Sequence, residues 1–387
     1  MSDRNSNSNE NGGPQCYRSH IEQVISIRPS KEYDCFINGS NLNYPPWARG
    51  VYGGQIMAQA LLAGYETVTT DFMVHSIHSH FLKAAQPEIS VIYRVERVRD
   101  TRSFATRLIR AMQRGILVFY STASFAKSNV SQESKRTLRH SASYPQVEKP
   151  PSNPLAQSPA GQTGPDQPCD CVRLASRMNS SASPSDKRFY HWVRARGNIA
   201  KSPLKAVESE DGRSCNSRSL GKISEDTAVI GNDYHRRNHQ AHAAALLYMS
   251  DNYFLATCFR AHNASRFSNP TSDHPGSSTI GYRANELDTA GRTFQALASE
   301  ELEDNQGASK DGGHVTMAAS MDHTVYFHNL HQLRADDWIL VEMESPWAGD
   351  ERGLVVSRIW SHDGTLAATC FQEGLVRLAQ PPHSSRL

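Results

Sequence analysis

The feature that most constrains the fold is a repeated order of segments. Each half of the 387-residue chain contains an apolar helix candidate, Gly54–Val68 and Gln240–Asp251, followed by runs in which β-branched and aromatic residues nearly alternate with polar ones. The strand-like runs are residues 74–82, 89–100, 102–115 and 116–125 in the first half, and residues 321–329, 338–346, 352–364 and 365–378 in the second. Because the same order of helix and strands occurs twice, we predict two copies of one architecture.

The spacing between matching positions supports a duplication. The intervals are 246, 250 and 249 residues for the pairs Phe81 and Phe327, Arg102 and Arg352, and Gly115 and Gly364. The two glycines follow Arg114 and Asp363, and each dipeptide lies between two strand-like runs, which is typical of a hairpin turn. The two halves are therefore expected to share one arrangement of strands.

Both helix candidates are apolar on several faces. Ile56, Met57 and Leu61 cover most of the first helix, and Ala243 to Leu247 cover the second. A helix that is apolar all round has to be buried. A long buried helix wrapped by an antiparallel sheet is the hotdog arrangement, so we predict an α+β fold with two tandem hotdogs that mimic a hotdog dimer.

Composition divides the chain into patterned and unpatterned stretches. The chain is polar, with 38% hydrophobic residues and a mean hydropathy of −0.57. Runs rich in Ser, Pro, Gln and Gly are typical of linkers and of low-complexity insertions. The predicted organisation is a disordered N-terminus (1–19), hotdog domain 1 (20–127), a linker (128–185), hotdog domain 2 (186–380) with insertions at about 201–238 and 262–313, and a tail (381–387).

Charge and hydropathy exclude several classes of protein. The net charge is +2, and Lys and Arg are spread along the chain, which argues against a nucleic-acid surface. No apolar run approaches the ~18 residues that span a bilayer, and the N-terminus lacks the apolar core of a secretory signal. There is no G-x-S-x-G elbow, Walker A motif or G-x-G-x-x-G motif, which argues against an α/β-hydrolase and against nucleotide- or dinucleotide-dependent enzymes.

Two groups of side chains could suggest a metal site. The seven cysteines are scattered, which fits a reducing compartment, and the only close pair, Cys169 and Cys171, lacks a second pair at zinc-binding spacing. His75, His78 and His80 lie on one predicted strand. Alternation places His75 on the face opposite the other two, and no acidic partner follows. We therefore predict no metal.

Several strings together resemble the acyl-CoA thioesterase II family, the double-hotdog enzymes of bacteria and peroxisomes. They are "VYGGQIMAQAL", "HSIHSHFL", "VERVRDTRSFATR", "SDNYFL", "MDHTVYFH", "RADDWILVEMESPWAGDERGLV" and "QEGLVR". The similarity covers about residues 20–125, 188–200, 239–260 and 314–378. Each string is weak alone, and their number and order make the resemblance specific.

The resemblance implies a catalytic network at Asp251, Ser320 and Gln372. The family has an Asp near the end of the second helix, a Thr or Ser two residues before a "DH" pair, and the Gln of "QEG". The hydroxyl residue here is Ser, which keeps the donor and acceptor of Thr. The "DH" pair itself, Asp322 and His323, is interpreted as structural.

The implied reaction is the hydrolysis of a fatty acyl-CoA to the free acid and CoA. A carboxylate acting as general base, with Ser and Gln fixing the water, would suffice for a reactive thioester. Backbone N–H groups at Gly53-Gly54-Gln55, where the first helix begins, are candidate oxyanion donors. No cofactor is expected, because coenzyme A is part of the substrate.

The last three residues, Ser385-Arg386-Leu387, resemble the peroxisomal S-K-L address with Arg in place of Lys. The family's eukaryotic members act in peroxisomes, so both observations predict peroxisomal import through the receptor that reads this signal. Without import the protein would be cytoplasmic. Homo-oligomerisation of the double hotdog is left open.

Two other functions stay open at this point. The two insertions flank the segments that carry Asp251 and Ser320, so the same site could pass the acyl group to a carrier-protein thiol, as an acyltransferase of a specialised pathway. The third hypothesis is a non-catalytic acyl-CoA binding protein, which the presence of Asp251, Ser320 and Gln372 argues against. A dehydratase would need a His/Asp or His/Glu pair at the central helix, and Gly53-Gly54-Gln55 does not supply one.

Overall fold

The structure is a computed structural model of the 387-residue chain. It describes residues 19–45, 48–127, 138–152, 167–174, 182–199, 225–267, 297, 301 and 313–380. The predictions for residues 1–18, for most of the linker and insertions, and for Ser385-Arg386-Leu387 fall outside the described residues.

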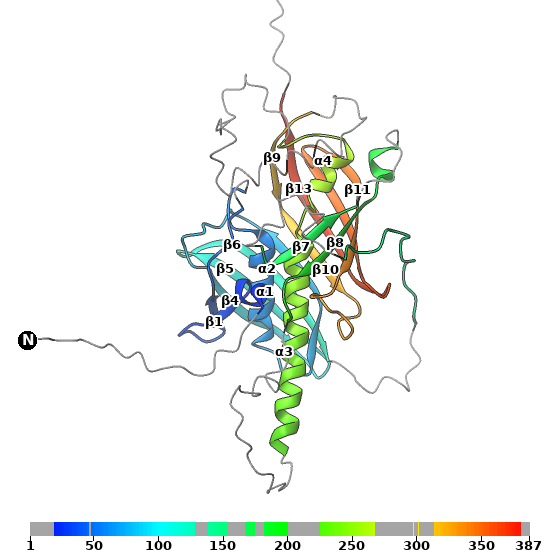
Figure 1. The fold of residues 1–387 in the computed structure, drawn as a ribbon. Helices are drawn as coiled ribbons and strands as arrows, with labels where there is room; N and C mark the ends of the chain where they lie inside the picture. The colour runs from blue at the N-terminus through cyan, green and yellow to red at the C-terminus, as the bar shows by residue number, and fades with distance from the viewer. Residues whose placement is uncertain are drawn as a thin grey trace, which may run out of the picture.

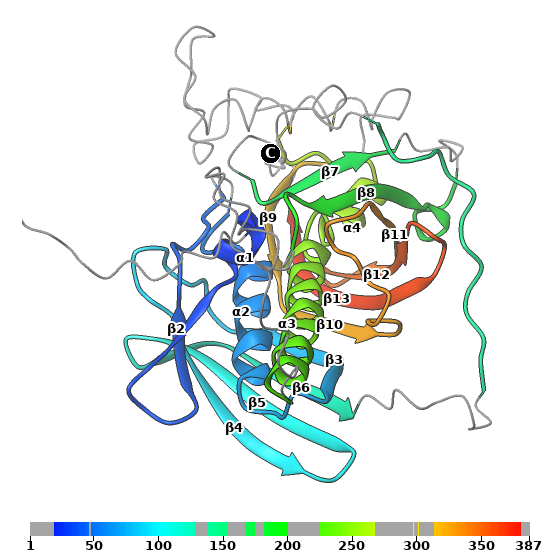
Figure 2. The ribbon, with the colours of Figure 1, turned by 60° about the horizontal axis from the view of Figure 1, so that its bottom comes forward.

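One antiparallel sheet runs through both halves of the chain and curls around a central pair of helices, α2 and α3 (Figure 1 and Figure 2). The strand order is β1-β2-β4-β5-β6-β3-β10-β13-β12-β11-β8-β7, and β9 pairs with β13 beside this path. The helices are α1 (His20–Val24), α2 (Gly53–Tyr65), α3 (Glu225–Ser250) and α4 (Ala256–Ala261), with a 3-10 turn η3 (Pro184–Asp186). The strands of the first half are β1 (Ile27–Pro29), β2 (Cys35–Asn38), β3 (Phe72–Phe81), β4 (Ile92–Asp100), β5 (Phe104–Gln113) and β6 (Ile116–Lys127). Those of the second half are β7 (Cys169–Arg173), β8 (Phe189–Ala195), β9 (Val315–Ser320), β10 (Asp322–Phe327), β11 (Ile339–Gly349), β12 (Arg352–Ser361) and β13 (Leu366–Leu378).

The two halves join where β3 pairs with β10. The register runs antiparallel from Asp322 opposite His80 to Tyr326 opposite Ser76. Each half contributes its own helix and its own set of strands to the fused sheet. This arrangement confirms the tandem hotdog predicted from the repeat.

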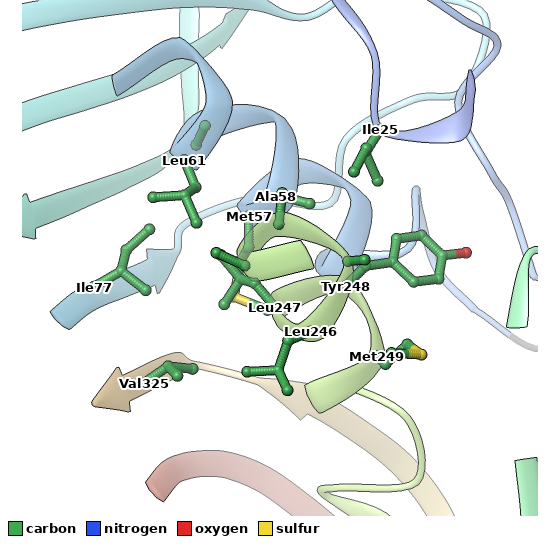
Figure 3. Packing of buried hydrophobic residues seen from close by; sticks show 14 of the residues in the cluster. Ile25, Met57, Ala58, Leu61, Ile77, Leu246, Leu247, Tyr248, Met249 and Val325 are labelled. Carbon is green, nitrogen blue, oxygen red and sulfur yellow. The ribbon is translucent and has the colours of Figure 1, made fainter. Parts of the chain in front are cut away.

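The core lies between the two helices and the concave face of the sheet. Met57 and Leu61 of α2 and Leu246 and Leu247 of α3 are fully buried, and Figure 3 shows them packed together with Val325 of β10. Burying each such side chain contributes roughly 1.5–3 kcal/mol. The all-round apolar pattern of both helices is thus explained, because each helix packs on its neighbour as well as on the sheet.

Tight turns connect the paired strands as their sequences indicate. Arg114 and Gly115, between β5 and β6, both have positive φ, 49° and 78°. Gly364, between β12 and β13, has a φ of 84°. Glycine adopts this conformation without steric cost, so the turn chemistry and the strand register agree.

The segment boundaries in the second half differ from prediction. Helix α3 begins at Glu225, inside the stretch expected to be a low-complexity insertion, and its ribbon extends below the sheet in Figure 1. Strand β7 lies inside the expected linker. It is a short strand that pairs with β8 at the edge of the sheet. The run expected at residues 321–329 is β10, which begins at Asp322, and β9, which ends at Ser320, lies before it and was not predicted.

None of the helices in the described part of the chain is long and apolar enough to cross a membrane.

Candidate active site

A cavity of about 650 Å³ lies where the N-terminus of α2 meets the C-terminus of α3. Both halves of the chain line it. Asp251, Ser320 and Gln372 all contribute to its wall, although they lie on three separate segments of the chain. The structure therefore brings together the three residues that the family resemblance singled out.

Asp251 follows the last residue of α3, and its carboxylate lies against the first turn of α2. Oδ2 accepts a hydrogen bond from the Gly54 backbone N–H at 3.0 Å, and Oδ1 accepts one from Gln372 Nε2 at 2.9 Å. Only 10% of the side chain is exposed. Burial raises the pKa of Asp251 to about 6, and the hydrogen bonds from Gln372 and Gly54 oppose that rise. A carboxylate with such a pKa can both take up and release a proton near neutral pH.

Gln372 is fully buried on β13 and connects Asp251 to a second polar group. Its Nε2 lies 2.9 Å from Asp251 Oδ1 and 3.1 Å from His323 Nδ1. The other ring nitrogen of His323, Nε2, lies 3.0 Å from Ser250 Oγ. Burial lowers the pKa of His323 to about 3, so the ring is neutral at physiological pH. Both ring nitrogens of the buried His323 therefore have partners.

Ser320 is the last residue of β9, which pairs with β13. Its register partner is Gly374, two residues beyond Gln372. Ser320 is half-buried and lines the cavity. Among the described residues its hydroxyl makes no hydrogen bond to Asp251 or Gln372, so any shared function would act through a molecule bound between them.

Of the three expected oxyanion donors at the start of α2, only one remains a candidate. The Gly54 N–H is bonded to Asp251, and the Gln55 N–H is bonded to Tyr52 O at 3.1 Å. The Gln55 side chain is also engaged, since its amide bonds the backbone of Val24 and Asn41. Of Gly53, Gly54 and Gln55, only Gly53 lines the cavity.

Two tyrosines at the cavity were not singled out from the sequence. The Tyr52 hydroxyl lies 2.8 Å from both Tyr248 O and Asn252 Oδ1, and the two tyrosine rings meet edge-on. Burial, and then the charge of Asp251, raise the pKa of Tyr52 well above its usual value. Both hydroxyls are therefore neutral. Tyr52 directly precedes the Gly53-Gly54 pair, but an aromatic residue before a helix has no distinctive pattern.

One of the insertions contributes to the cavity wall. Leu297, from the stretch expected to be a low-complexity insertion, is 3% exposed and lines the cavity. Glu301 is also buried, and its carboxylate accepts hydrogen bonds from the backbone N–H groups of Arg266 and Phe267. Part of this insertion therefore forms the cavity wall at Leu297.

The histidines of β3 are arranged differently from prediction. The register of β3 against β6 shifts between Val74 and Ser76, which indicates a bulge at His75. Beyond the bulge, His75, His78 and His80 are all half-buried while Val74 and Ser79 are buried, so the three histidines share one face. The assignment of His75 to the opposite face is therefore wrong. Within the described ranges, no three His, Cys, Asp or Glu side chains are grouped as metal ligands would be.

Comparison with known sequences identifies both halves. Residues 43–126 match the family model for the acyl-CoA thioesterase N-terminal domain, and residues 232–376 match the model for the C-terminal domain. The chain is 29% identical to human acyl-coenzyme A thioesterase 8, over 95% of this chain and 92% of that protein. It is 25% identical to acyl-CoA thioesterase 2 of Haemophilus influenzae, over 86% of this chain and 89% of that protein. The peroxisomal acyl-coenzyme A thioester hydrolase 1 of Saccharomyces cerevisiae is 22% identical, over 92% of this chain and 94% of that protein.

Comparison with solved structures supports the fold. The crystal structure of an acyl-CoA thioesterase II from Mycobacterium marinum superposes with a TM-score of 0.57 at 22% identity, covering 93% of this chain and 99% of that one. The two domain models occur in order along one chain, and the residues that line the cavity come from both. The chain belongs to the acyl-CoA thioesterase family, in its double-hotdog form.

Proposed function

We propose that this protein hydrolyses fatty acyl-CoA thioesters to the free acid and CoA, with Asp251 as the general base. The observation that carries the proposal is the buried carboxylate of Asp251 at the cavity wall, held by hydrogen bonds to both of its oxygens. The relatives named above as acyl-CoA thioesterases support the substrate class. No cofactor is needed, because the thioester carbonyl is already reactive.

The reaction begins when a water molecule in the cavity loses a proton to Asp251 as its oxygen attacks the thioester carbonyl carbon. The resulting tetrahedral oxyanion collapses, the C–S bond breaks, and the CoA thiolate takes a proton from Asp251. Base catalysis of this kind contributes about 10²–10⁴-fold. The pKa of Asp251, near 6, leaves it mostly ionised at neutral pH and still basic enough to accept the proton.

Ser320 and Gln372 hold the water beside Asp251 in this proposal. The three side chains line one cavity, Asp251 directly after α3, Ser320 at the end of β9 and Gln372 on β13. The Gly53 N–H, where α2 begins, is the remaining candidate donor to the oxyanion. A helix N-terminus favours negative charge, which would stabilise the intermediate.

The cavity wall suggests how the substrate lies. Arg49 and Lys83 line the cavity and are exposed, so they can meet the phosphates of CoA. Leu255, Phe259 and Leu297 form an apolar part of the wall that suits an acyl chain. Apolar walls with few polar groups are typical of small-molecule sites.

We also propose a peroxisomal location. The yeast relative is named as a peroxisomal enzyme, which supports the assignment. A fluorescent fusion at the N-terminus should be imported into peroxisomes, and removing Ser385-Arg386-Leu387 should leave it in the cytosol. Import that survives the deletion would exclude this tripeptide as the signal.

The function is tested by measuring free thiol and free fatty acid from a panel of acyl-CoAs of different chain length. Hydrolysis predicts one acid for each thiol with no added acceptor. Thiol release that requires an added carrier-protein thiol would instead indicate an acyltransferase. Tight binding of acyl-CoA without thiol release at any chain length would indicate a binding protein.

A further inference from the structure

We infer that His323 is a positioning residue, through which Ser250 fixes the orientation of the Gln372 side-chain amide so that its nitrogen holds the Asp251 carboxylate. The inference rests on the proposed function, since it assigns a role to a group behind the proposed catalytic residues. It extends the site to His323 and Ser250, neither of which lines the cavity.

The Ser250 hydroxyl determines which atoms donate and which accept along this series of hydrogen bonds. Its hydroxyl lies 2.9 Å from Leu247 O, in the last turn of α3. A carbonyl oxygen can only accept, so the Ser250 proton points to Leu247. The Ser250 oxygen is then left to accept a hydrogen bond, and His323 Nε2 lies 3.0 Å away. His323 Nε2 must therefore carry the proton.

The proton on Nε2 sets the role of the other ring nitrogen. In a neutral imidazole only one nitrogen is protonated, so His323 Nδ1 is an acceptor. Its partner at 3.1 Å is the Gln372 side-chain nitrogen. The His323 ring is fully buried and meets the Phe254 ring edge-on at 5.2 Å, so packing holds the ring in this orientation.

The Gln372 amide has no freedom left once these bonds form. Its two N–H groups are directed to Asp251 Oδ1 and His323 Nδ1. The opposite amide orientation would place Oε1 against the carboxylate of Asp251 and against the unprotonated Nδ1, which is repulsive at both positions. Gln372 Oε1 is buried and has no hydrogen-bond partner within the described residues. An unpaired buried oxygen is costly, so this orientation depends on the two N–H bonds to Asp251 and His323.

The groups around Asp251 leave it as the titrating member of the cluster. Within the described part of the chain, the ionisable side chains that interact with it are His323, at 3.8 Å, and the two tyrosines Tyr52 and Tyr248. Burial lowers the pKa of His323 to about 3 and raises those of both tyrosines, so none changes charge between pH 5 and 9. The Gln372 hydrogen bond lowers the pKa of Asp251, so losing His323 as the anchor of Gln372 should raise it.

The test compares His323→Leu, which removes the acceptor, with His323→Asn, whose Oδ1 can replace Nδ1. We expect His323→Leu to lower kcat by about 10–100-fold with KM changed little, because a small misplacement of the Asp251 carboxylate is enough to slow the reaction. The acid limb of its pH–rate profile should move to higher pH. His323→Asn should recover most of the rate and return the limb toward its wild-type position. Ser250→Ala should change both quantities in the same direction as His323→Leu, to a smaller extent.

A matched control is the pair His242→Leu and His242→Asn. His242 is another buried neutral histidine, on α3 and outside the cavity, and its Nδ1 accepts a hydrogen bond from the Ala335 N–H. Its variants should lower thermal stability and leave kcat and the acid limb unchanged. Equal loss of kcat in His323→Leu and His323→Asn with an unmoved limb would overturn the inference, as would wild-type kinetics in His323→Leu.

The pH dependence of unfolding keeps the test independent of turnover. The titration of Asp251 should appear in the stability of the folded protein whether or not acyl-CoA is hydrolysed. The midpoint pH of this stability change, if raised in His323→Leu and restored in His323→Asn, would support the inference even if the wild type released no thiol. That last result would contradict only the proposed function. A midpoint unmoved in both variants would contradict the positioning role.

Discussion

The Gln372 side chain donates a hydrogen bond to the Asp251 carboxylate across 2.9 Å, although the two residues are 121 positions apart in the chain. The contact joins the end of α3 to the middle of β13. It combines with the Gly54 N–H of α2, so that three segments fix one carboxylate. The site therefore forms only when the two hotdogs have fused around their paired helices.

The pKa of Asp251, about 6, predicts the pH dependence of hydrolysis. The base must be ionised, so kcat should be constant above about pH 7 and should fall to roughly a tenth of its plateau near pH 5. Thiol release should be measured with a reagent that reacts at acidic pH, on one acyl-CoA at saturation. A profile that stays flat down to pH 4.5 would exclude Asp251 as the group that limits the rate.

The stability of the folded protein should depend on Asp251 in the opposite direction to activity, falling as the pH rises. The folded pKa of Asp251, about 6, lies above its ordinary value of 3.8, so the folded state binds the proton more tightly. Its contribution is therefore full below about pH 4 and is lost as the pH rises to about 6. Each pKa unit corresponds to ~1.36 kcal/mol, so the loss is about 3 kcal/mol. Asp251→Asn should lack this loss.

Urea unfolding of the two proteins between pH 4 and 7 checks this prediction. The free energy of unfolding of Asp251→Asn, minus that of the wild type, should increase by about 2.5 kcal/mol across the range. A constant offset can be present at every pH, because an amide cannot accept both hydrogen bonds equally well. A difference that does not change with pH would show that burial does not perturb Asp251.

The first turn of α2 should not tolerate a side chain. A Cβ on Gly54 would lie 2.4 Å from Tyr248 O and 2.5 Å from Tyr52 Cε1, closer than any real contact. Gly54→Ala should therefore destabilise the protein by about 1–3 kcal/mol and displace the Asp251 carboxylate. Gly64→Ala, in the last turn of the same helix, is the matched control, since its Cβ would meet only the ends of two side chains, Phe125 Cζ at 3.3 Å and Ile109 Cδ1 at 3.6 Å. Thermal melts that show equal losses for both variants would contradict this account.

Replacing Gln372 by Glu tests the bond between Gln372 and Asp251 with almost no change in shape. The substitution places a second carboxylate about where the amide now contacts Asp251. Two carboxylates that share a site cannot both ionise easily, so one pKa is strongly raised. We expect kcat at pH 7 to fall by about 10²-fold and to recover partly at higher pH, where both groups ionise. An unchanged rate at pH 7 would mean that Gln372 does not contact the working carboxylate.

The sequence predicted the architecture because the repeat has a strong physical signal. Two helices apolar on every face and two sets of alternating strands fit few other folds, and all eight predicted strand runs overlap observed strands. The residues of the site were located only through the family resemblance. Ser320 and Asp251 are ordinary polar residues until the pairing of β9 with β13 and the packing of α3 on α2 bring them to one cavity.

Other features depend on contacts that no local pattern encodes. The bulge at His75 changes which face its side chain occupies, and alternation alone cannot indicate it. Leu297 lies in a stretch rich in polar residues, and its burial follows from the cavity it closes. The hydrogen bond that the Gly54 N–H donates to Asp251 could not be predicted either, because the carboxylate lies 197 residues away in the sequence.

The most direct test of the central claim compares thiol release by the wild type with that of Asp251→Ala, Ser320→Ala and Gln372→Ala, all confirmed as folded by circular dichroism and thermal melts. The account predicts that kcat on the best acyl-CoA falls by about 10²–10⁴-fold in Asp251→Ala and markedly in the other two. Folded variants that release thiol at the wild-type rate, Asp251→Ala above all, would contradict it.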